Sequence, residues 1–140
     1  MKLVYQPYQI EKGNNDYPKT KGNLILFLDE TVCSVYFFVK AISGGWGRGS
    51  ISHGIYTLSN PSRLVDTDQN KPYKSSVYPW WISLTPIIPL RGSITNAGLH
   101  GDGNVAGSEG CICPIEKDVD FFETVKPLID SGQLKHLEVL

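Results

Sequence analysis

The chain lacks an excess of charge of either sign. Its 140 residues carry 13 Lys and Arg against 14 Asp and Glu, which gives a formal net charge of −1, and the basic residues form no run. A protein that neutralises many phosphates needs clustered Lys and Arg. The composition therefore argues against nucleic acid as a partner.

Long hydrophobic runs are also missing. The longest apolar stretches, such as Leu24–Leu28 and Val35–Val39, are far shorter than the roughly 20 residues that a helix needs to cross a bilayer. No charged region followed by an apolar segment opens the chain, so we expect neither a membrane span nor a secretory signal peptide. Without such a signal, we expect the protein to stay in the cytoplasm unless a secretion system or lysis delivers it elsewhere.

Cysteine is scarce, which excludes a disulfide framework. The three cysteines are Cys33, Cys111 and Cys113, and the last two are too close for an unstrained bridge in an extended segment. At least one thiol is therefore expected to be unpaired. A chain of this length buries about two-thirds of its unfolded surface, so we expect one domain over residues 1–140, with no cofactor and no metal.

Runs of β-branched and aromatic residues predict a mostly β (α+β) domain. Two runs between Asn23 and Lys40 flank the polar pair Asp29–Glu30 and predict a hairpin, in which Cys33 is assigned to packing. Further strands are predicted at Gly54–Leu58, Val77–Leu84 (with Pro79 near its start) and Leu134–Leu140, and a surface loop at Ser59–Ser76.

Helical spacing appears once, near the end of the chain. Apolar residues at Val119, Phe122, Val125 and Ile129 predict a helix. Asp118 or Asp120 is expected at its N-cap. Pro127 lies inside the pattern, so we expect a kink or two short helical pieces.

Two segments are rich in glycine. Ser43–Ser50 is predicted to be a loop that displays Trp46 and Arg48. Asn96–Pro114 contains five glycines, which implies tight turns and close backbone approach. The second segment also holds a histidine and two of the three cysteines.

His100 and Cys111 can form a nucleophile and base pair. A thiol becomes a useful nucleophile when an imidazole takes its proton and backbone amides face the developing oxyanion. Gly110 would leave room for a carbonyl substrate beside the thiol, and the carbonyl of Gly101 or the carboxylate of Asp102 would hold the imidazole tautomer. The alternative is structural, with a turn histidine and a buried strand cysteine.

These residues resemble a known family signature. Ser108-Glu109-Gly110-Cys111-Ile112, preceded by Leu99-His100-Gly101, is similar to the His-Gly and Ser/Thr-x-Gly-Cys-Ile/Val motifs of YkuD-type L,D-transpeptidase catalytic domains. The short His-to-Cys spacing resembles the compact branch, which includes type VI secretion effectors and phage-associated proteins. Ser43–Gly47 and Ser52–Leu58 resemble that branch's glycine loop and following strand, and the likeness covers about Leu24 to Leu140.

The resemblance implies a single-domain β-sandwich or barrel with one or two short helices after the nucleophile. It implies that Cys111 attacks a peptidoglycan stem tetrapeptide at the carbonyl before its terminal D-Ala, with His100 as base and the Gly101 carbonyl orienting it. Ser108 and the amides near Gly110 would shape the oxyanion site. The thioester would pass to water or to an amine. Implied partners are the stem peptide and an immunity protein or secretion component.

Two positions depart from the family pattern. Cys113 stands where the family usually has Arg, and Glu109 stands where the larger branch has His. A carboxylate beside the thiol would tend to raise its pKa. Arg48 is the expected substitute for the missing cation, and Trp46 and Asp102 are further candidates for the substrate side of the site.

Three other functions are weighed against this one. Papain-like and NlpC-type peptidases place the cysteine before a distant histidine, whereas only His136, expected on a strand surface, follows Cys111. A zinc hydrolase would draw its ligands from His53, His100, Asp102 and Cys111. A non-catalytic binding module for cell walls, or one linked to phage or secretion, would use the aromatic side chains of Trp46, Trp80 and Trp81.

Overall fold

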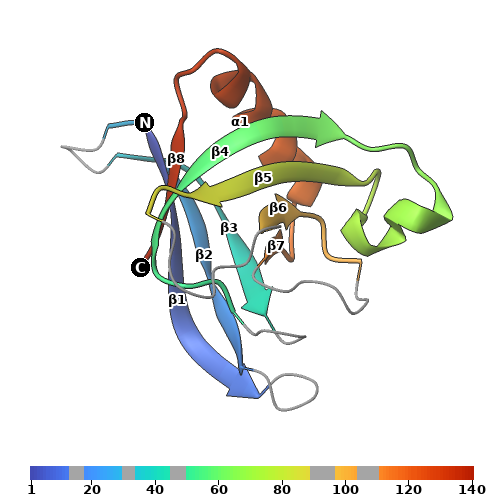
Figure 1. Ribbon diagram of the computed structural model, residues 1–140, viewed down its shortest axis with the longest axis horizontal. Helices are drawn as coiled ribbons and strands as arrows, with labels where there is room; N and C mark the ends of the chain where they lie inside the picture. Colours follow the sequence, from blue (N-terminus) through green and yellow to red (C-terminus); the bar gives the residue numbers. More distant parts are fainter. Residues whose placement is uncertain (13–17, 30–33, 45–49, 89–96, 104–110) are drawn as a thin grey trace.

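The computed structural model describes residues 1–12, 18–29, 34–44, 50–88, 97–103 and 111–140. Within them, eight strands close into a barrel in the order β1-β2-β3-β7-β6-β5-β4-β8 (Figure 1). The strands are β1 (Lys2–Lys12), β2 (Pro18–Phe27), β3 (Val35–Gly44), β4 (Gly54–Arg63), β5 (Trp80–Pro86), β6 (Gly98–His100), β7 (Ile112–Pro114) and β8 (His136–Val139). The mostly β expectation is confirmed.

The predicted hairpin is present as β2 and β3, which pair antiparallel with Leu24 opposite Val39. Alternate residues of both strands point into the barrel, where Leu24 and Val39 are fully buried. Gly54–Leu58 begins β4, Pro79 immediately precedes β5, and β8 lies within the predicted last strand. These strands follow from composition and period-two burial.

The sequence did not indicate β1. Its Leu3, Val4 and Tyr5 are all buried, so this part of the strand shows no alternation of apolar and polar residues, and Pro7 and the polar residues after it add none. The pairing with β2 shifts register between Pro7 and Gln9, which accommodates the proline at an irregularity. On its other side, β1 runs parallel to β8, with Leu3 opposite Leu137.

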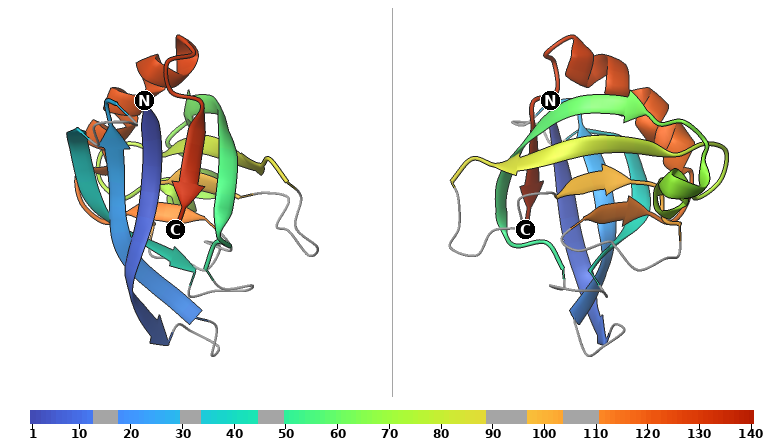
Figure 2. Two further views of the ribbon diagram at one scale, coloured as in Figure 1. Left: turned by 90° about the vertical axis from the view of Figure 1, so that its left-hand side faces the viewer. Right: turned by 45° about the vertical axis from the view of Figure 1, so that its right-hand side comes forward.

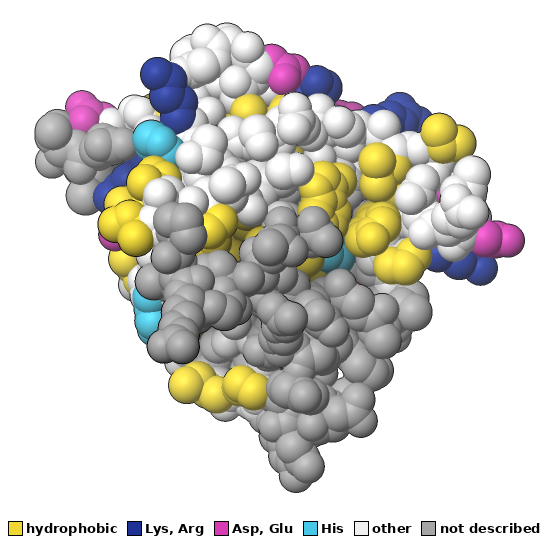
Figure 3. Space-filling model, viewed as in Figure 1, with side chains coloured by type: hydrophobic (Ala, Val, Ile, Leu, Met, Phe, Trp, Pro, Cys, Tyr) yellow, Lys and Arg dark blue, Asp and Glu magenta, His cyan; other side chains and the backbone are white. Residues whose placement is uncertain are grey.

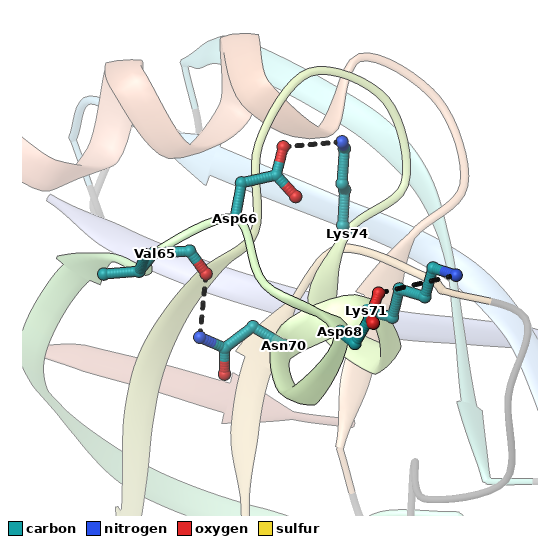
Figure 4. Close-up of polar contacts among 6 residues, drawn as sticks. All are labelled: Val65, Asp66, Asp68, Asn70, Lys71 and Lys74. Carbon is teal, nitrogen blue, oxygen red and sulfur yellow. Dashed lines mark hydrogen bonds and ion pairs between the residues drawn. The ribbon is translucent and has the colours of Figure 1, made fainter.

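The loop predicted at Ser59–Ser76 is partly wrong. Strand β4 continues to Arg63, and a 3-10 helix, η2 (Asp68–Tyr73), follows it. The outward side chains of this part of β4 are exposed and polar, which is why the segment resembled a loop. Polar contacts around η2 link Lys74 to Asp66 at 2.8 Å and the Asn70 side chain to the Val65 carbonyl at 2.9 Å, with a longer 3.9 Å pair between Lys71 and Asp68 (Figure 4).

One α-helix follows β7. Helix α1 (Asp118–Asp130) lies across one end of the barrel (Figure 2) and buries Phe121, Phe122 and Val125. It continues through Pro127 as one helix, so of the two expected outcomes, a kink or two short pieces, the division into two pieces is wrong. The buried side chains precede the proline, whose own side chain is exposed, and they hold the helix against the barrel.

The expected N-cap is also wrong. Lys117, in the left-handed region at φ 48°, occupies the N-cap position without a side-chain cap bond. The Asp118 carboxylate instead accepts hydrogen bonds from Trp80 Nε1 (2.9 Å) and Ser76 Oγ (2.7 Å). Among the described helices, none is long and apolar enough to cross a membrane.

Candidate active site

The candidate site is built on β6 and β7, two short neighbouring strands that run parallel. Leu99 is opposite Ile112, and both side chains are fully buried in the core. Side chains alternate along a strand, so His100 and Cys113, the next residues, share the other face. They are nevertheless only 2% and 1% exposed, which makes this a desolvated pair of titratable groups.

The imidazole of His100 is held by the residue that follows it. Nδ1 lies 2.7 Å from the carbonyl oxygen of Gly101. A carbonyl oxygen can only accept, so Nδ1 carries the proton and Nε2 is left with the lone pair of a base. Of the two acceptors considered from the sequence, Gly101 and Asp102, it is the Gly101 carbonyl that makes this bond.

Gly101 is required by the packing around it. A Cβ atom there would lie 2.7 Å from the carbonyl oxygen of Tyr73 and 2.9 Å from Asp118 Oδ2. The backbone after η2 therefore runs directly against the residue that orients His100. Close backbone approach was the sequence-based expectation for this glycine-rich segment, and the geometry at Gly101 confirms it.

The thiol of Cys113 contacts the imidazole of His100. Its Sγ lies 3.6 Å from both Nδ1 and Nε2. If Sγ lay in the plane of the imidazole at these two equal distances, it would overlap the ring carbon that joins the two nitrogens. The sulfur therefore lies above or below the ring plane. The contact packs the thiol against the imidazole rather than along either N–H direction.

Cys111 precedes β7 and is 2% exposed. Its backbone carbonyl accepts a 2.6 Å hydrogen bond from the Ser43 hydroxyl, which in turn accepts one from the Ile51 amide at 2.9 Å. Among the described residues, neither Cys111 nor Cys113 forms a disulfide bond. The role of Cys111 as nucleophile stays a prediction.

Burial sets the protonation state of the pair. Burial lowers the pKa of His100, although the Gly101 hydrogen bond and the charge of Asp102 act in the opposite direction. Burial also raises the pKa of the Cys113 thiol, helped by Cys111 and Asp102. Both shifts favour neutral groups, so His100 is available as a neutral base at neutral pH.

These shifts predict a stability profile with two limbs. Below about pH 6.5, the ordinary pKa of histidine, the unfolded chain binds a proton that buried His100 resists. The free energy of unfolding therefore falls as the pH decreases through this region. Above the ordinary thiol pKa, the unfolded chain loses a proton that Cys113 keeps, so stability also falls as the pH rises.

Urea unfolding of the protein between pH 5 and 10 measures both limbs. His100→Gln is expected to flatten the acid limb between pH 7 and 5, and Cys113→Ala to flatten the alkaline one. His136→Gln is the matched control, because His136 is exposed on β8. An acid limb of unchanged slope in His100→Gln would contradict the assignment.

The remaining sequence candidates have different outcomes. Trp46, Arg48, Ser108 and Gly110 lie outside the described residues, as do Cys33 and Glu109. Asp102 is half-buried and acts on His100 through its charge. His136 is exposed on its strand, as expected.

The residues named for the binding module and for the zinc hydrolase lie in different surroundings. Trp80 is wrong as a ligand-holding residue, because it is fully buried and stacked on Phe122. His53 lines two cavities of about 270 and 500 Å³ beside β4 and β1. In the part of the chain that is described, no three His, Cys, Asp or Glu side chains are grouped to hold a metal ion.

Sequence reasoning missed two contributors to the site. Tyr73 packs edge-on against the His100 ring, with centroids 5.1 Å apart, and lies in a segment taken for a loop. Ser43 was assigned to a loop, although it ends a strand pattern with inward Val39 and Ala41. The sequence signal for Ser43 was its position: it is the next alternate residue after the inward-facing Val39 and Ala41.

Comparison with known proteins adds no relative: no family model, curated protein or solved structure matches the chain. The likeness to L,D-transpeptidases rests on the residues from Leu99 to Gly101 and from Ser108 to Ile112. The functional argument therefore depends on the chemistry of the site itself.

Proposed function

We propose that the protein is a cysteine-dependent acyl-transfer enzyme that cleaves or exchanges the terminal D-amino acid of peptidoglycan stem tetrapeptides. The observation that carries the proposal is the 2.7 Å contact between His100 Nδ1 and the Gly101 carbonyl. It leaves Nε2 as a fixed base, and the strand beside it carries Cys113, with Cys111 immediately before that strand. An oriented imidazole base near thiols supports nucleophilic catalysis by a cysteine.

The reaction follows from these groups. His100 Nε2 takes the proton of Cys111 Sγ as the sulfur attacks the carbonyl carbon before the terminal D-Ala. The tetrahedral intermediate collapses when the carbon–nitrogen bond breaks, and protonated His100 gives its proton to the leaving amine. Water or a second amine then attacks the thioester, His100 takes its proton, and the Cys111 thiolate leaves and is reprotonated.

A neutral imidazole at His100 suits this sequence of steps. Because burial lowers the pKa of His100, the imidazole is unprotonated at neutral pH and can accept the thiol proton in the first step. The developing imidazolium then has the Gly101 carbonyl at Nδ1 and the charge of Asp102 to stabilise it. The resting form of His100 is thus an unprotonated base.

The family resemblance supplies the substrate class and the finer fold. A histidine strand, a cysteine strand, one helix and a final strand follow one another in the order that an L,D-transpeptidase-like domain implies. Peptidoglycan as substrate places the reaction in the periplasm or cell wall, after delivery by a secretion system or lysis. An immunity protein or secretion component is the matching protein partner.

Release of D-Ala from purified tetrapeptide muropeptides tests the proposal. The protein is expected to release it, Cys111→Ala to abolish release, and Cys113→Ala to keep part of it. His136→Ala, an exposed site outside this cluster, serves as the control that keeps full activity, and a chelator should have no effect.

Each other outcome has a definite meaning. If Cys113→Ala abolishes release and Cys111→Ala does not, the nucleophile is Cys113. Inhibition by chelator together with zinc in the purified protein would replace the thiol mechanism with a metal one. Binding to sacculi without any change in muropeptides, in the protein and in Cys111→Ala alike, would identify a binding module.

A further inference from the structure

Trp81 lies on the imidazole of His100. The two residues are direct partners across the antiparallel pair β5–β6. Their ring planes differ by 8° and their centroids are 5.4 Å apart, so the rings are stacked. His100 is buried, whereas Trp81 is half-buried. The stacked pair thus has its more exposed ring in Trp81, and Figure 3 shows hydrophobic side chains gathered at the surface over β5 and η2.

Three neighbours fix the indole in this position. Trp81 Nε1 donates a hydrogen bond to Ser83 Oγ at 3.1 Å, which sets the direction of the ring. Gly98 lies beneath the ring, where a Cβ atom would overlap the indole carbons. Tyr73 packs edge-on against Trp81, with centroids 5.4 Å apart. The ring thus extends along β6 from His100 to Gly98.

We propose that Trp81 is the positioning residue of His100: its indole face holds the imidazole plane and stabilises the positive charge that His100 acquires with the thiol proton. The proposal rests on the acyl-transfer function proposed above. A cation within about 6 Å of a tryptophan centroid is attracted to the face of the ring, and the attraction grows as the pair is desolvated. The observed separation is within that range.

The other groups around His100 do not replace this contribution. Gly101 binds Nδ1 through its carbonyl, and Asp102 acts through its charge. Cys113 contributes a neutral thiol, and Tyr73 presents its ring at an angle of 81° to the imidazole. Among these contacts, the parallel aromatic face comes from Trp81.

The test compares Trp81→Phe, which keeps an aromatic face, with Trp81→Leu, which keeps an apolar side chain but no π-system. The imidazole pKa of His100 is measured by NMR titration, and kcat and KM by D-Ala release from tetrapeptide muropeptides. Both the pKa and kcat are expected to fall in the order Trp, Phe, Leu. The Leu variant should lose about tenfold in kcat with KM changed less than about twofold.

Two further variants separate positioning from general packing. Gly98→Ala pushes the indole off β6 without altering either ring, so it should shift the pKa of His100 in the same direction as Trp81→Leu. Tyr36→Leu removes an exposed aromatic side chain of β3 and should change neither quantity. If Trp81→Leu fails to fold, Trp81→Phe and Gly98→Ala still give the comparison.

An unchanged pKa of His100 in Trp81→Leu, or equal values in the Phe and Leu variants, would overturn the proposal. The titration needs no substrate, so it decides the role of Trp81 even if the protein releases no D-Ala. In that case the enzymatic proposal fails while the stacking argument is judged on its own result. A loss confined to KM would assign Trp81 to substrate binding instead.

Discussion

Replacing His100 with Asn is expected to lower kcat for D-Ala release by about 10³-fold, since general acid–base catalysis contributes roughly 10²–10⁴. Asn can still pack beneath Trp81, but it cannot take the thiol proton or return it to the leaving amine. KM should change little, because the imidazole acts on the reacting atoms. Steady-state kinetics on a tetrapeptide muropeptide measure both quantities.

The control for this variant is its stability. His100→Asn has to unfold cooperatively in urea, and His53→Asn, an exposed histidine outside β6, should keep full activity. A kcat within about threefold of the original in a folded His100→Asn would remove His100 from the mechanism. Loss of activity in His53→Asn would instead direct attention to the cavities beside β4.

Replacing Asp118 with Ala is expected to lower the free energy of unfolding by about 2–4 kcal/mol, because hydrogen bonds to charged groups contribute roughly 1.5–3 kcal/mol each. Asp118 is 2% exposed and accepts bonds from Trp80 and Ser76. The variant leaves the Trp80 N–H buried without its acceptor. Urea unfolding followed by tryptophan fluorescence measures the loss.

Two further variants serve as comparisons for the stability loss in Asp118→Ala. Asp118→Asn keeps one side-chain oxygen as acceptor, so it should lose roughly half as much stability. Asp68→Ala changes a carboxylate that is 99% exposed and should stay within about 0.5 kcal/mol of the original. A similarly small loss in Asp118→Ala would show that water replaces the carboxylate. Because Asp118 also lies beside Gly101, Asp118→Ala should reduce D-Ala release as well.

Local sequence signals predicted the elements whose partners are close in the chain. The hairpin of β2 and β3 follows from two alternating runs around a polar turn, and Pro79 marks the start of β5. The glycines after Ala97 predicted close approach of other groups to the backbone, and the structure shows such approach at Gly98 and Gly101. Those features depend on residues near one another and on backbone sterics.

Pairing between distant segments was not predictable in the same way. Parallel pairing places Leu99 opposite Ile112 and so sets Cys113 beside His100. The sequence favoured Cys111 as the nucleophile because the motif and its spacing from His100 point to it. Neither the motif nor the spacing gives the register in which β6 and β7 pair. A shift of one residue reverses every side chain. The stacking of Trp81 on His100 depends on a second such register.

The parallel contact between β1 and β8 has a consequence for how the protein is made. Leu3 finds its partner Leu137 almost a full chain length away, and closing so long a loop before contacts form slows folding. Until residues 136–139 have been synthesised, β1 and β4 each lack β8, their neighbour on one side. Unpaired strand edges favour association with other chains. The barrel, and the strands that carry His100 and Cys113 within it, can therefore close only late, when the final strand enters between the first and the fourth.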